Sequence, residues 1–213
     1  MPTRFRENTL PGFALALDLG ADGLELDVHA TRDGVAIVHH DPTLADGSEI
    51  ALLSRAELAQ REAAPGVPIP TLAEVCDVVQ TRAALYVEIK AEGIEAAVMR
   101  VLARHPGEVA IHSFDHALIG RLYRAGCAIP LGVLFEDDAC DLDAVLAATG
   151  ARDIWPHFSL VTPALVGHAH AAGRRVIAWT VNDADVARSL VDAGVDGLCG
   201  DDITILPARV PAT

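Results

Sequence analysis

One short unit recurs along this chain: an amphipathic helix, then a glycine, then a short strand of apolar and β-branched residues. Apolar residues spaced three and four apart in 10–17 predict a helix, Gly20 ends it, and Gly23–Val28 follows as a strand. The turn at 19–24 is nearly repeated at 193–198, close to the other end of the chain. Strands that alternate with helices favour βαβ units around a parallel sheet, so the sequence predicts an α/β fold.

Seven strands of this kind are expected. They lie at Gly23–Val28, Ala84–Ile89, Val109–His112, Leu131–Leu134, Asp153–Trp155, Val176–Val181 and Gly197–Cys199. Asp33-Gly34 is a hairpin signal, so Val35–His39 is expected to fold back on the strand before it. Two architectures fit this pattern: a TIM (β/α)8 barrel short of one strand, and an open doubly wound sheet. The 213 residues are few for the barrel, which typically has roughly 250.

The chain shows no internal boundary. No linker rich in Pro, Gly or Ser divides it, so we expect a single domain over residues 1–213. The least regular stretch is a short insertion near residues 46–70, where Ser54 and Glu57 predict the capping box of one short helix. Thr71 and Glu74 predict a second capping box for the helix that follows.

The charge balance excludes several classes of partner. Lys and Arg number 16 against 30 Asp and Glu, and this net charge of −14 argues against nucleic acid and anionic membranes. No apolar run is long enough to span a bilayer, and the start has no apolar signal-peptide core. The four cysteines are scattered without a Cys-x-x-Cys pair, which is typical of reduced thiols. We therefore expect a cytoplasmic protein without stable membrane association.

Acidic side chains end two of the expected strands. Glu25 and Asp27 are two residues apart, so both carboxylates point to the same side of their strand. Such a pair is costly when buried unless a cation or proton compensates it, and Mg²⁺ or Ca²⁺ takes such oxygen ligands. The alternative is one exposed acid and one aspartate that caps the following loop. Glu88 and Lys90 repeat the spacing and suit a metal ligand beside an anion-binding cation, or a plain salt bridge.

His40, Trp179 and Asn182 also fall near strand ends. His40 precedes Asp41 after the hairpin strand, and a histidine is the usual general acid or base, although this turn also suits a structural role. Trp179 suits the wall of a ligand pocket or the core. In a barrel, catalytic groups lie at the carboxyl ends of strands. The joint placement of these residues favours a metal-assisted site that acts on an anionic ester.

The same residues belong to a longer ordered series of motifs. The series is Glu7-Asn8-Thr9-Leu10, Gly20 to Val28, Thr31-Arg32-Asp33-Gly34, His40-Asp41, Ile69-Pro70-Thr71-Leu72, Glu88-Ile89-Lys90, Ser113-Phe114-Asp115 and Trp179-Thr180-Val181-Asn182. In this order they resemble the glycerophosphodiester phosphodiesterase family, from residue 6 to about residue 202. The resemblance covers nearly the whole chain, and the set of motifs is highly specific.

The resemblance implies a TIM-barrel enzyme that splits glycerophosphodiesters into glycerol 3-phosphate and an alcohol, with a divalent metal, Mg²⁺ or Ca²⁺. It implies that His40 is one of two acid/base histidines and that Lys90 takes part in catalysis by binding phosphate. The residues implied to bind the metal are Glu25, Asp27 and Glu88, and those expected to bind substrate are Lys90, Trp179 and Asn182. Trp179 is implied to line the pocket near the glycerol.

The sequence departs from the family pattern in three places. The His-Arg-Gly motif that ends the family's first strand occurs nowhere in this sequence, and Arg6 stands where the family has a proline. The usual Arg-Thr-Thr reads Asp46-Gly47-Ser48, and the closing Thr-Asp-x-Pro reads Gly200-Asp201-Asp202-Ile203. We therefore expect a barrel without its first strand and without its second catalytic histidine, with open edges beside Gly23–Val28 and Gly197–Cys199.

Three functions are open at this point. The first is a metal-dependent glycerophosphodiesterase whose chain has lost its front end, which the loss of one contiguous motif favours. The second is a catalytically impaired barrel that binds metal or phosphate without turnover, and the third is a related phosphodiesterase acting on phospholipid headgroups. Because one of two acid/base groups is missing, we expect these 213 residues to have weak activity or none.

Overall fold

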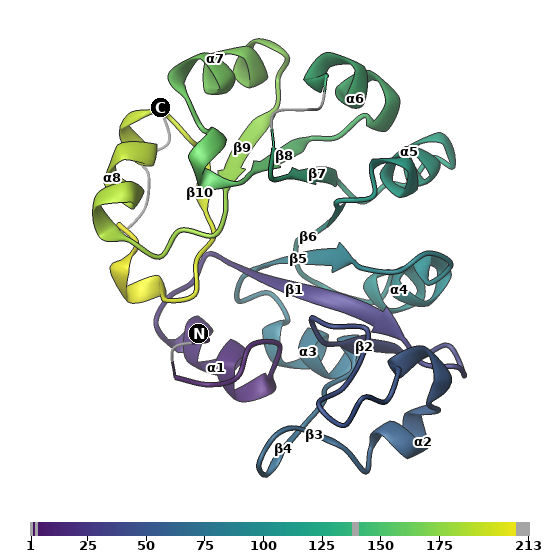
Figure 1. Cartoon of the computed structure of the whole chain (residues 1–213). Helices are drawn as coiled ribbons and strands as arrows, with labels where there is room; N and C mark the ends of the chain where they lie inside the picture. The colour runs from purple at the N-terminus through teal and green to yellow at the C-terminus, as the bar shows by residue number, and fades with distance from the viewer. Residues whose placement is uncertain (1, 3, 138–140, 208–213) are drawn as a thin grey trace. The chain divides into compact units, whose positions relative to one another are not determined.

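A computed structural model describes residues 2, 4–137 and 141–207 (Figure 1). The chain divides into two compact units, Met1–Ala110 and Ile111–Thr213, which are described in turn. The single domain over residues 1–213 stays a prediction. Within the described ranges, none of the helices combines the length and the apolar character that crossing a membrane requires.

Three strands of the first unit form the order β5-β1-β2. β1 (Gly23–Ala30) and β5 (Ala84–Ile89) are parallel, in a register that runs from Gly23 beside Ala84 to Val28 beside Ile89. β2 (Ala36–Val38) is antiparallel to β1 and pairs with its last three residues, as the hairpin signal predicts. Among the described strands, β5 is therefore the only partner of residues 23–27 in β1.

Three of the four helices described in the first unit begin where the sequence predicts, and the fourth, Glu95–Leu102, was not predicted. The four are α1 (Leu10–Asp18), α2 (Arg55–Leu58), α3 (Leu72–Val79) and α4 (Glu95–Leu102). Thr71 and Glu74 form the predicted capping box of α3, and Ser54 and Glu57 form that of α2. The two boxes hold because each side chain satisfies a backbone N–H that the first helical turn leaves without a partner.

The segment at residues 46–70 is more ordered than expected. It contains a 3₁₀ turn η1 (Ile50–Leu52), the helix α2, and a hairpin of β3 (Glu62–Ala64) and β4 (Val67–Pro68). A separate small core forms beneath it from Ile37, Leu44, Ile50, Leu58 and Ile69. Burial of these apolar side chains orders a stretch whose local sequence signals only one helix.

Among its described residues, the second unit alternates five strands with four α-helices. Its parallel strands follow the order β6-β7-β8-β9-β10, and β6 starts on the last two residues of the first unit. The strands are β6 (Val109–Ser113), β7 (Leu131–Phe135), β8 (Asp153–Pro156), β9 (Arg175–Ala178) and β10 (Gly197–Leu198). The helices are α5 (His116–Arg124), α6 (Leu142–Thr149), α7 (Pro163–Ala171) and α8 (Ala184–Asp192), with 3₁₀ turns η2 (Phe158–Leu160) and η3 (Ile203–Ile205).

One predicted strand ends early. We expected Val176–Val181, but β9 ends at Ala178. Beyond that residue the backbone makes single bonds to different neighbours: Trp179 N–H donates to Pro156 O at 3.2 Å, and Val181 N–H donates to Cys199 O at 2.8 Å. The regular ladder therefore stops there, and the following side chains stand at the carboxyl edge of the sheet.

Candidate active site

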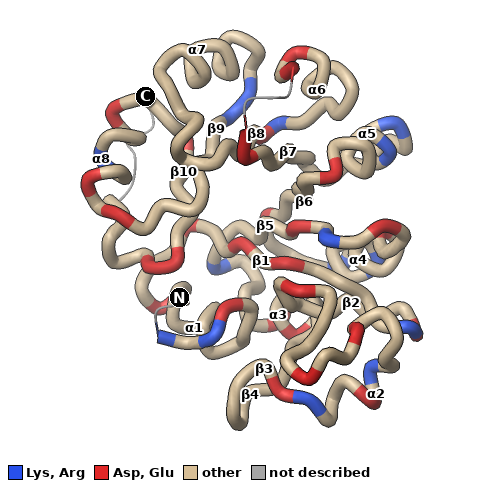
Figure 2. The backbone as a smooth tube through the Cα atoms, viewed as in Figure 1, with Lys and Arg blue, Asp and Glu red and all other residues tan. Residues whose placement is uncertain are grey.

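Acidic side chains gather where β1 and β5 run side by side. Glu25 and Asp27 alternate along β1, so their side chains leave the same face of the strand. The register sets Asp27 beside Glu88 of β5, and Figure 2 shows acidic positions on both strands. Asp27 and Glu88 are each 6% exposed, and Glu25 is half-buried. The three predicted metal ligands thus lie on two neighbouring strands, largely out of water.

Lys90 lies one residue beyond β5, within reach of two of these carboxylates. Its Nζ atom is 3.2 Å from Oδ1 of Asp27 and 3.0 Å from Oε1 of Glu88. Burial disfavours the charged ammonium, but the two carboxylates outweigh this effect and raise the pKa of Lys90. Lys90 is also the only lysine in the sequence. Its raised pKa favours the charged ammonium, which offers a compact positive charge to an anionic group.

The carboxylates of this cluster outnumber its ammonium group. Loss of hydration raises the pKa of Glu25 well above its ordinary value, and the charge of Asp27 raises it further. The charges of Lys90 and His40 act in the opposite direction without cancelling the rise, which also places His40 within electrostatic reach. A bound cation would favour the ionised form of these carboxylates. The donor set therefore fits a hard divalent ion.

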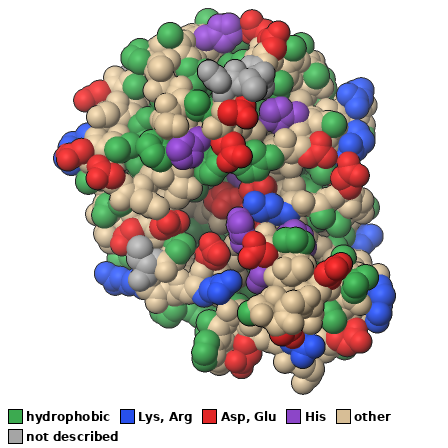
Figure 3. Space-filling model, in the orientation of Figure 1, with side chains coloured by type: hydrophobic (Ala, Val, Ile, Leu, Met, Phe, Trp, Pro, Cys, Tyr) green, Lys and Arg blue, Asp and Glu red, His purple; other side chains and the backbone are tan. Residues whose placement is uncertain are grey.

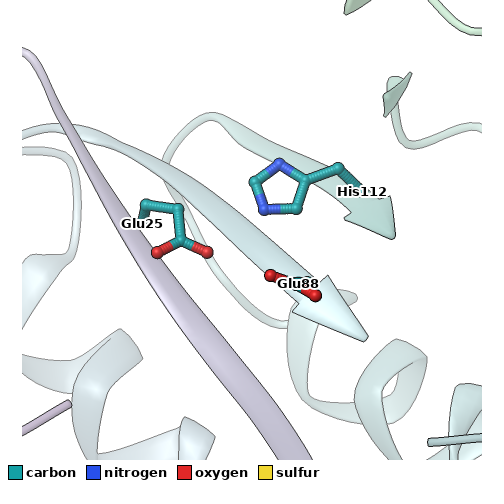
Figure 4. A group of neighbouring side chains, drawn as sticks. All are labelled: Glu25, Glu88 and His112. Carbon is teal, nitrogen blue, oxygen red and sulfur yellow. The ribbon is translucent and has the colours of Figure 1, made fainter. Parts of the chain in front are cut away.

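Glu25, Glu88 and His112 form a group that could hold a metal ion. Each side chain offers one ligand atom, and these atoms lie within 4.8 Å of one another (Figure 4). His112 belongs to β6 and is 1% exposed. Sequence reasoning missed His112, although a histidine at the last position of an expected barrel strand was a usable signal. Asp27 is outside this group, and its role as a metal ligand stays a prediction.

Asn8 is a second residue that sequence reasoning missed. Its Nδ2 group donates to Oδ2 of Asp27 at 2.7 Å, and the Asp27 backbone N–H donates to Oδ1 of Asn8 at 3.1 Å. Asn8 adopts a left-handed backbone conformation with a φ of 57°, which asparagine tolerates better than most residues. The motif Glu7-Asn8-Thr9-Leu10 was visible, but only the structure shows that Asn8 orients the Asp27 carboxylate.

His40 stands on the turn that follows β2. Its Nδ1 atom hydrogen-bonds to Oδ1 of Asp41 at 3.0 Å, and the two side chains are 51% and 59% exposed. This hydrogen bond is the main reason that the pKa of Asp41 is lowered. With Nδ1 donating to Asp41, Nε2 remains to accept a proton, as a general base requires. Figure 3 shows histidine, acidic and basic side chains close together in the lower half of the visible face.

Trp179 and Asn182 belong to the second unit. The indole Nε1 of Trp179 donates to Trp155 O at 2.8 Å, and its ring meets those of Phe114 and His157 edge to face. The exposed Asn182 donates from Nδ2 to Oδ2 of Asp201 at 2.7 Å and accepts the Asp201 backbone N–H at 2.9 Å. Asn182 thus links the loops after β9 and β10, and substrate binding by both residues stays a prediction.

Two solved structures resemble the chain over nearly its whole length. One from Silicibacter pomeroyi has a TM-score of 0.85 and 29% identity, covering 93% of this chain and 86% of that one. An Oleispira antarctica phosphodiesterase, in complex with the product sn-glycerol-3-phosphate, has a TM-score of 0.85 and 28% identity, covering 92% and 87%. The fold class is therefore the TIM (β/α)8 barrel of phosphodiesterase type, which confirms the prediction.

A family model also matches nearly the whole chain, and this match identifies the family. The model of the Glycerophosphoryl diester phosphodiesterase family matches residues 1–205. A Caldanaerobacter subterraneus protein named glycerophosphodiester phosphodiesterase is 30% identical over 216 residues, covering 92% of this chain and 88% of the relative. The chain belongs to this family and is an enzyme, as the ordered motifs predict.

Proposed function

We propose that this enzyme hydrolyses glycerophosphodiesters to glycerol 3-phosphate and an alcohol, in a reaction that requires a divalent metal. The observation that carries the proposal is the cluster of Glu25, Asp27 and Glu88, in which burial and the charge of Asp27 raise the pKa of Glu25 and Lys90 lies beside the other two carboxylates. The substrate class is supported by the family and by the Oleispira relative with its bound product.

Glu25, Asp27 and Glu88 would hold the metal, with His112 as a further donor. Oxygen ligands of this kind suit Mg²⁺ and Ca²⁺. When bound, such an ion neutralises charge on the phosphate oxygens as the bonds to phosphorus change. Asn8 keeps the Asp27 carboxylate in a fixed orientation through its two hydrogen bonds. Orientation of a ligand by a neighbouring amide strengthens metal binding, so we include Asn8 in the site.

Lys90 binds a phosphate oxygen in this proposal. Its side chain is only 19% exposed, and a charge in such a place is weakly screened by water. The protein has a net charge of −14, so a local cation is needed to retain an anionic substrate. Trp179 and Asn182 contribute substrate contacts, Trp179 near the glycerol.

His40 moves the first proton. It removes the proton of a glycerol hydroxyl while that oxygen attacks phosphorus, a P–O bond forms, and the P–O bond to the alcohol breaks. The leaving alkoxide takes up a proton, and water then opens the cyclic phosphate to give glycerol 3-phosphate. The His-Arg-Gly motif that carries the family's second histidine is absent from this sequence, so solvent supplies the proton of the leaving group. We expect this loss to slow turnover by about 10²–10⁴-fold.

The test is turnover of glycerophosphocholine by the 213-residue chain with Mg²⁺ or Ca²⁺, followed as release of choline and glycerol 3-phosphate. We expect weak activity that His40→Ala lowers by roughly a further 10²-fold without abolishing it. His168→Ala is the matched control, because His168 is an exposed histidine of α7 paired with Asp143. Activity that His40→Ala leaves unchanged contradicts the mechanism, and turnover as fast as that of relatives with both histidines contradicts the expected weakness. Metal or phosphate binding without turnover supports the binding-protein alternative instead.

The phosphate role of Lys90 has a separate readout. Because Lys90 is the only lysine, reductive methylation with ¹³C-formaldehyde labels one side chain, besides the amino terminus. We expect inorganic phosphate to shift the NMR signal of this side chain and to leave the amino-terminal signal in place. A signal that does not move at saturating phosphate contradicts the assignment.

A further inference from the structure

Two buried histidines hold the turn that carries His40. His29 and His39 are 6% and 8% exposed, whereas His40 projects into solvent. The Nε2 atom of His29 lies 3.1 Å from the backbone oxygen of His40. The Nδ1 atom of His39 lies 2.8 Å from the backbone oxygen of Asp41. A carbonyl oxygen only accepts hydrogen bonds, so both ring nitrogens carry the hydrogen and donate it.

These histidines are unusual choices for positions inside the fold. His29 pairs with Ile37 in the register of β1 and β2, and the His39 backbone N–H donates to Asp27 O at 3.0 Å. Val28 and Val38, the residues that directly precede His29 and His39, are fully buried apolar side chains. Burying an imidazole is costly unless its polar atoms are bonded. The two imidazoles therefore hydrogen-bond to the backbone of one turn, where apolar side chains would only have extended the core.

The turn needs these two hydrogen bonds because the exposed side chain of His40 is only weakly held in place by its own contacts. The imidazole is 51% exposed, and Asp41, its hydrogen-bond partner at Nδ1, is 59% exposed. An exposed pair of this kind contributes little to holding a geometry in water. The direction of the His40 side chain then depends on the two peptide groups whose oxygens His29 and His39 hold.

We propose that His29 and His39 are positioning residues, which hold the peptide oxygens of His40 and Asp41 so that the His40 imidazole faces the reacting hydroxyl. This inference rests on the acid/base role of His40 given above. Neither residue contacts the substrate in this account, and neither transfers a proton. Their contribution is geometric, and a displacement of about 1 Å of a catalytic group costs roughly 100-fold in rate.

Paired substitutions test the two hydrogen bonds separately. His29→Gln keeps a donor at the reach of Nε2, and His39→Asn keeps one at the reach of Nδ1, whereas His29→Leu and His39→Leu remove the donors. We expect each leucine variant to lower kcat by roughly 10–100-fold with KM nearly unchanged. The amide variants should recover most of kcat. Equal losses in the amide and leucine variants would contradict positioning through the hydrogen bond.

A double-mutant cycle shows whether the effect passes through His40. The His40→Ala variant has no imidazole at this position to orient. In that background, His29→Leu and His39→Leu should therefore lower the residual kcat by less than about two-fold. Losses as large as those in the wild-type background would overturn the proposal. Because His29 lies two residues from Asp27, the apparent metal affinity is measured alongside, and we expect it to stay unchanged.

His116→Leu is the matched control. The Nε2 atom of His116 bonds to the backbone oxygen of Leu134 at 2.8 Å, so this variant removes the same type of bond at a different place. We expect it to lower the urea midpoint of unfolding and to leave kcat within about two-fold. If a leucine variant at 29 fails to fold, the amide variant and the two variants at 39 decide the matter. Wild type without any turnover refutes the proposed function, whereas active wild type with unaffected leucine variants refutes only this inference.

Discussion

Two buried acidic clusters in this molecule balance their charge in opposite ways. At the carboxyl ends of β1 and β5, Glu25, Asp27 and Glu88 share the single ammonium of Lys90. Loss of hydration and like charge raise the pKa of Glu25, so the ionised cluster is held at a cost in free energy. A bound cation would offset this cost, so the cluster is suited to binding a metal ion.

The second cluster satisfies its charge internally. Asp153, at the start of β8, is 0% exposed and accepts two hydrogen bonds each from Arg152 and Arg175, at 2.6–3.0 Å. Burial alone would raise the pKa of Asp153, but the bonds from the two guanidinium groups outweigh it and lower the pKa. Such bidentate pairs are strong and need no ligand. The pKa of Asp153 is lowered by its partners, whereas the pKa of Glu25 is raised by burial and like charge, so the two clusters differ in how strongly they favour the ionised form.

The largest expected effect is on catalytic activity, which a substitution in the first cluster should lower and one in the second should not. Glu88→Gln keeps the shape of the side chain but removes a charge that the metal needs. We expect kcat/KM to fall by at least about 10³-fold, matching the loss on adding EDTA, while the metal-free protein keeps its stability. Asp153→Asn serves as the comparison and should retain kcat/KM. Undiminished activity in Glu88→Gln would remove the distinction between the clusters.

The second prediction distinguishes the two clusters by how much each contributes to the free energy of unfolding. Asp153→Asn leaves two guanidinium groups beside a neutral amide, and we expect the free energy of unfolding to fall by about 2–3 kcal/mol. This value lies below that for a fully buried pair, because the two arginine side chains are each 40% exposed. Urea unfolding of both variants measures the difference. A loss in Glu88→Gln equal to that in Asp153→Asn would show that the first cluster is also structural.

The third prediction concerns pH. The pKa of Asp153 is lower in the folded protein than the usual value of about 3.9 in an unfolded chain, so the unfolded state binds protons first as pH falls. Its stabilisation is complete above roughly pH 5 and is lost as pH drops through 3.9 toward the folded pKa. In urea titrations we expect the stability difference between wild type and Asp153→Asn to stay constant from about pH 6 to about pH 5 and then to shrink toward about pH 3.5. A difference that stayed constant over the whole range would show that the carboxylate charge is not its cause.

The smallest effect comes from an exposed ion pair. Arg82 Nη2 lies 2.7 Å from Oδ1 of Asp18, with the two side chains 48% and 69% exposed. Water and salt screen such a pair, so Asp18→Asn should cost less than about 1 kcal/mol and even less in 1 M salt. A cost similar to that of Asp153→Asn would mean that burial is not what separates strong pairs from weak ones here.

Much of this protein could be predicted from local signals. The two capping boxes, the hairpin after Gly34 and the strand from Ala84 to Ile89 all appear in the structure. The spacing of Glu25 and Asp27 predicted their shared face, because side chains of a strand alternate. These features depend on residues that are close together in the sequence, and such signals are readable without a structure.

Other features depended on contacts that no local pattern encodes. Asn8 reaches Asp27 across 19 positions of sequence, and the ligand atom of His112 comes within 4.8 Å of those of Glu25 and Glu88. The hairpin β3–β4 forms over a small apolar core whose members lie far apart in the chain. Burial and hydrogen bonding between distant segments decide such contacts.

The sequence by itself determined the α/β fold, the order of the motifs and the residues that carry charge. Only the tertiary structure decided which of those carboxylates have a raised pKa and which have a lowered one. Glu25 and Asp153 are both acidic residues of β-strands, and although Asp27 and Arg152 are visible as their sequence neighbours, the burial of both carboxylates and the second guanidinium, of Arg175, are not. The difference arises because desolvation and the number of nearby cations depend on the packing of distant segments, and this packing exists only in the folded chain.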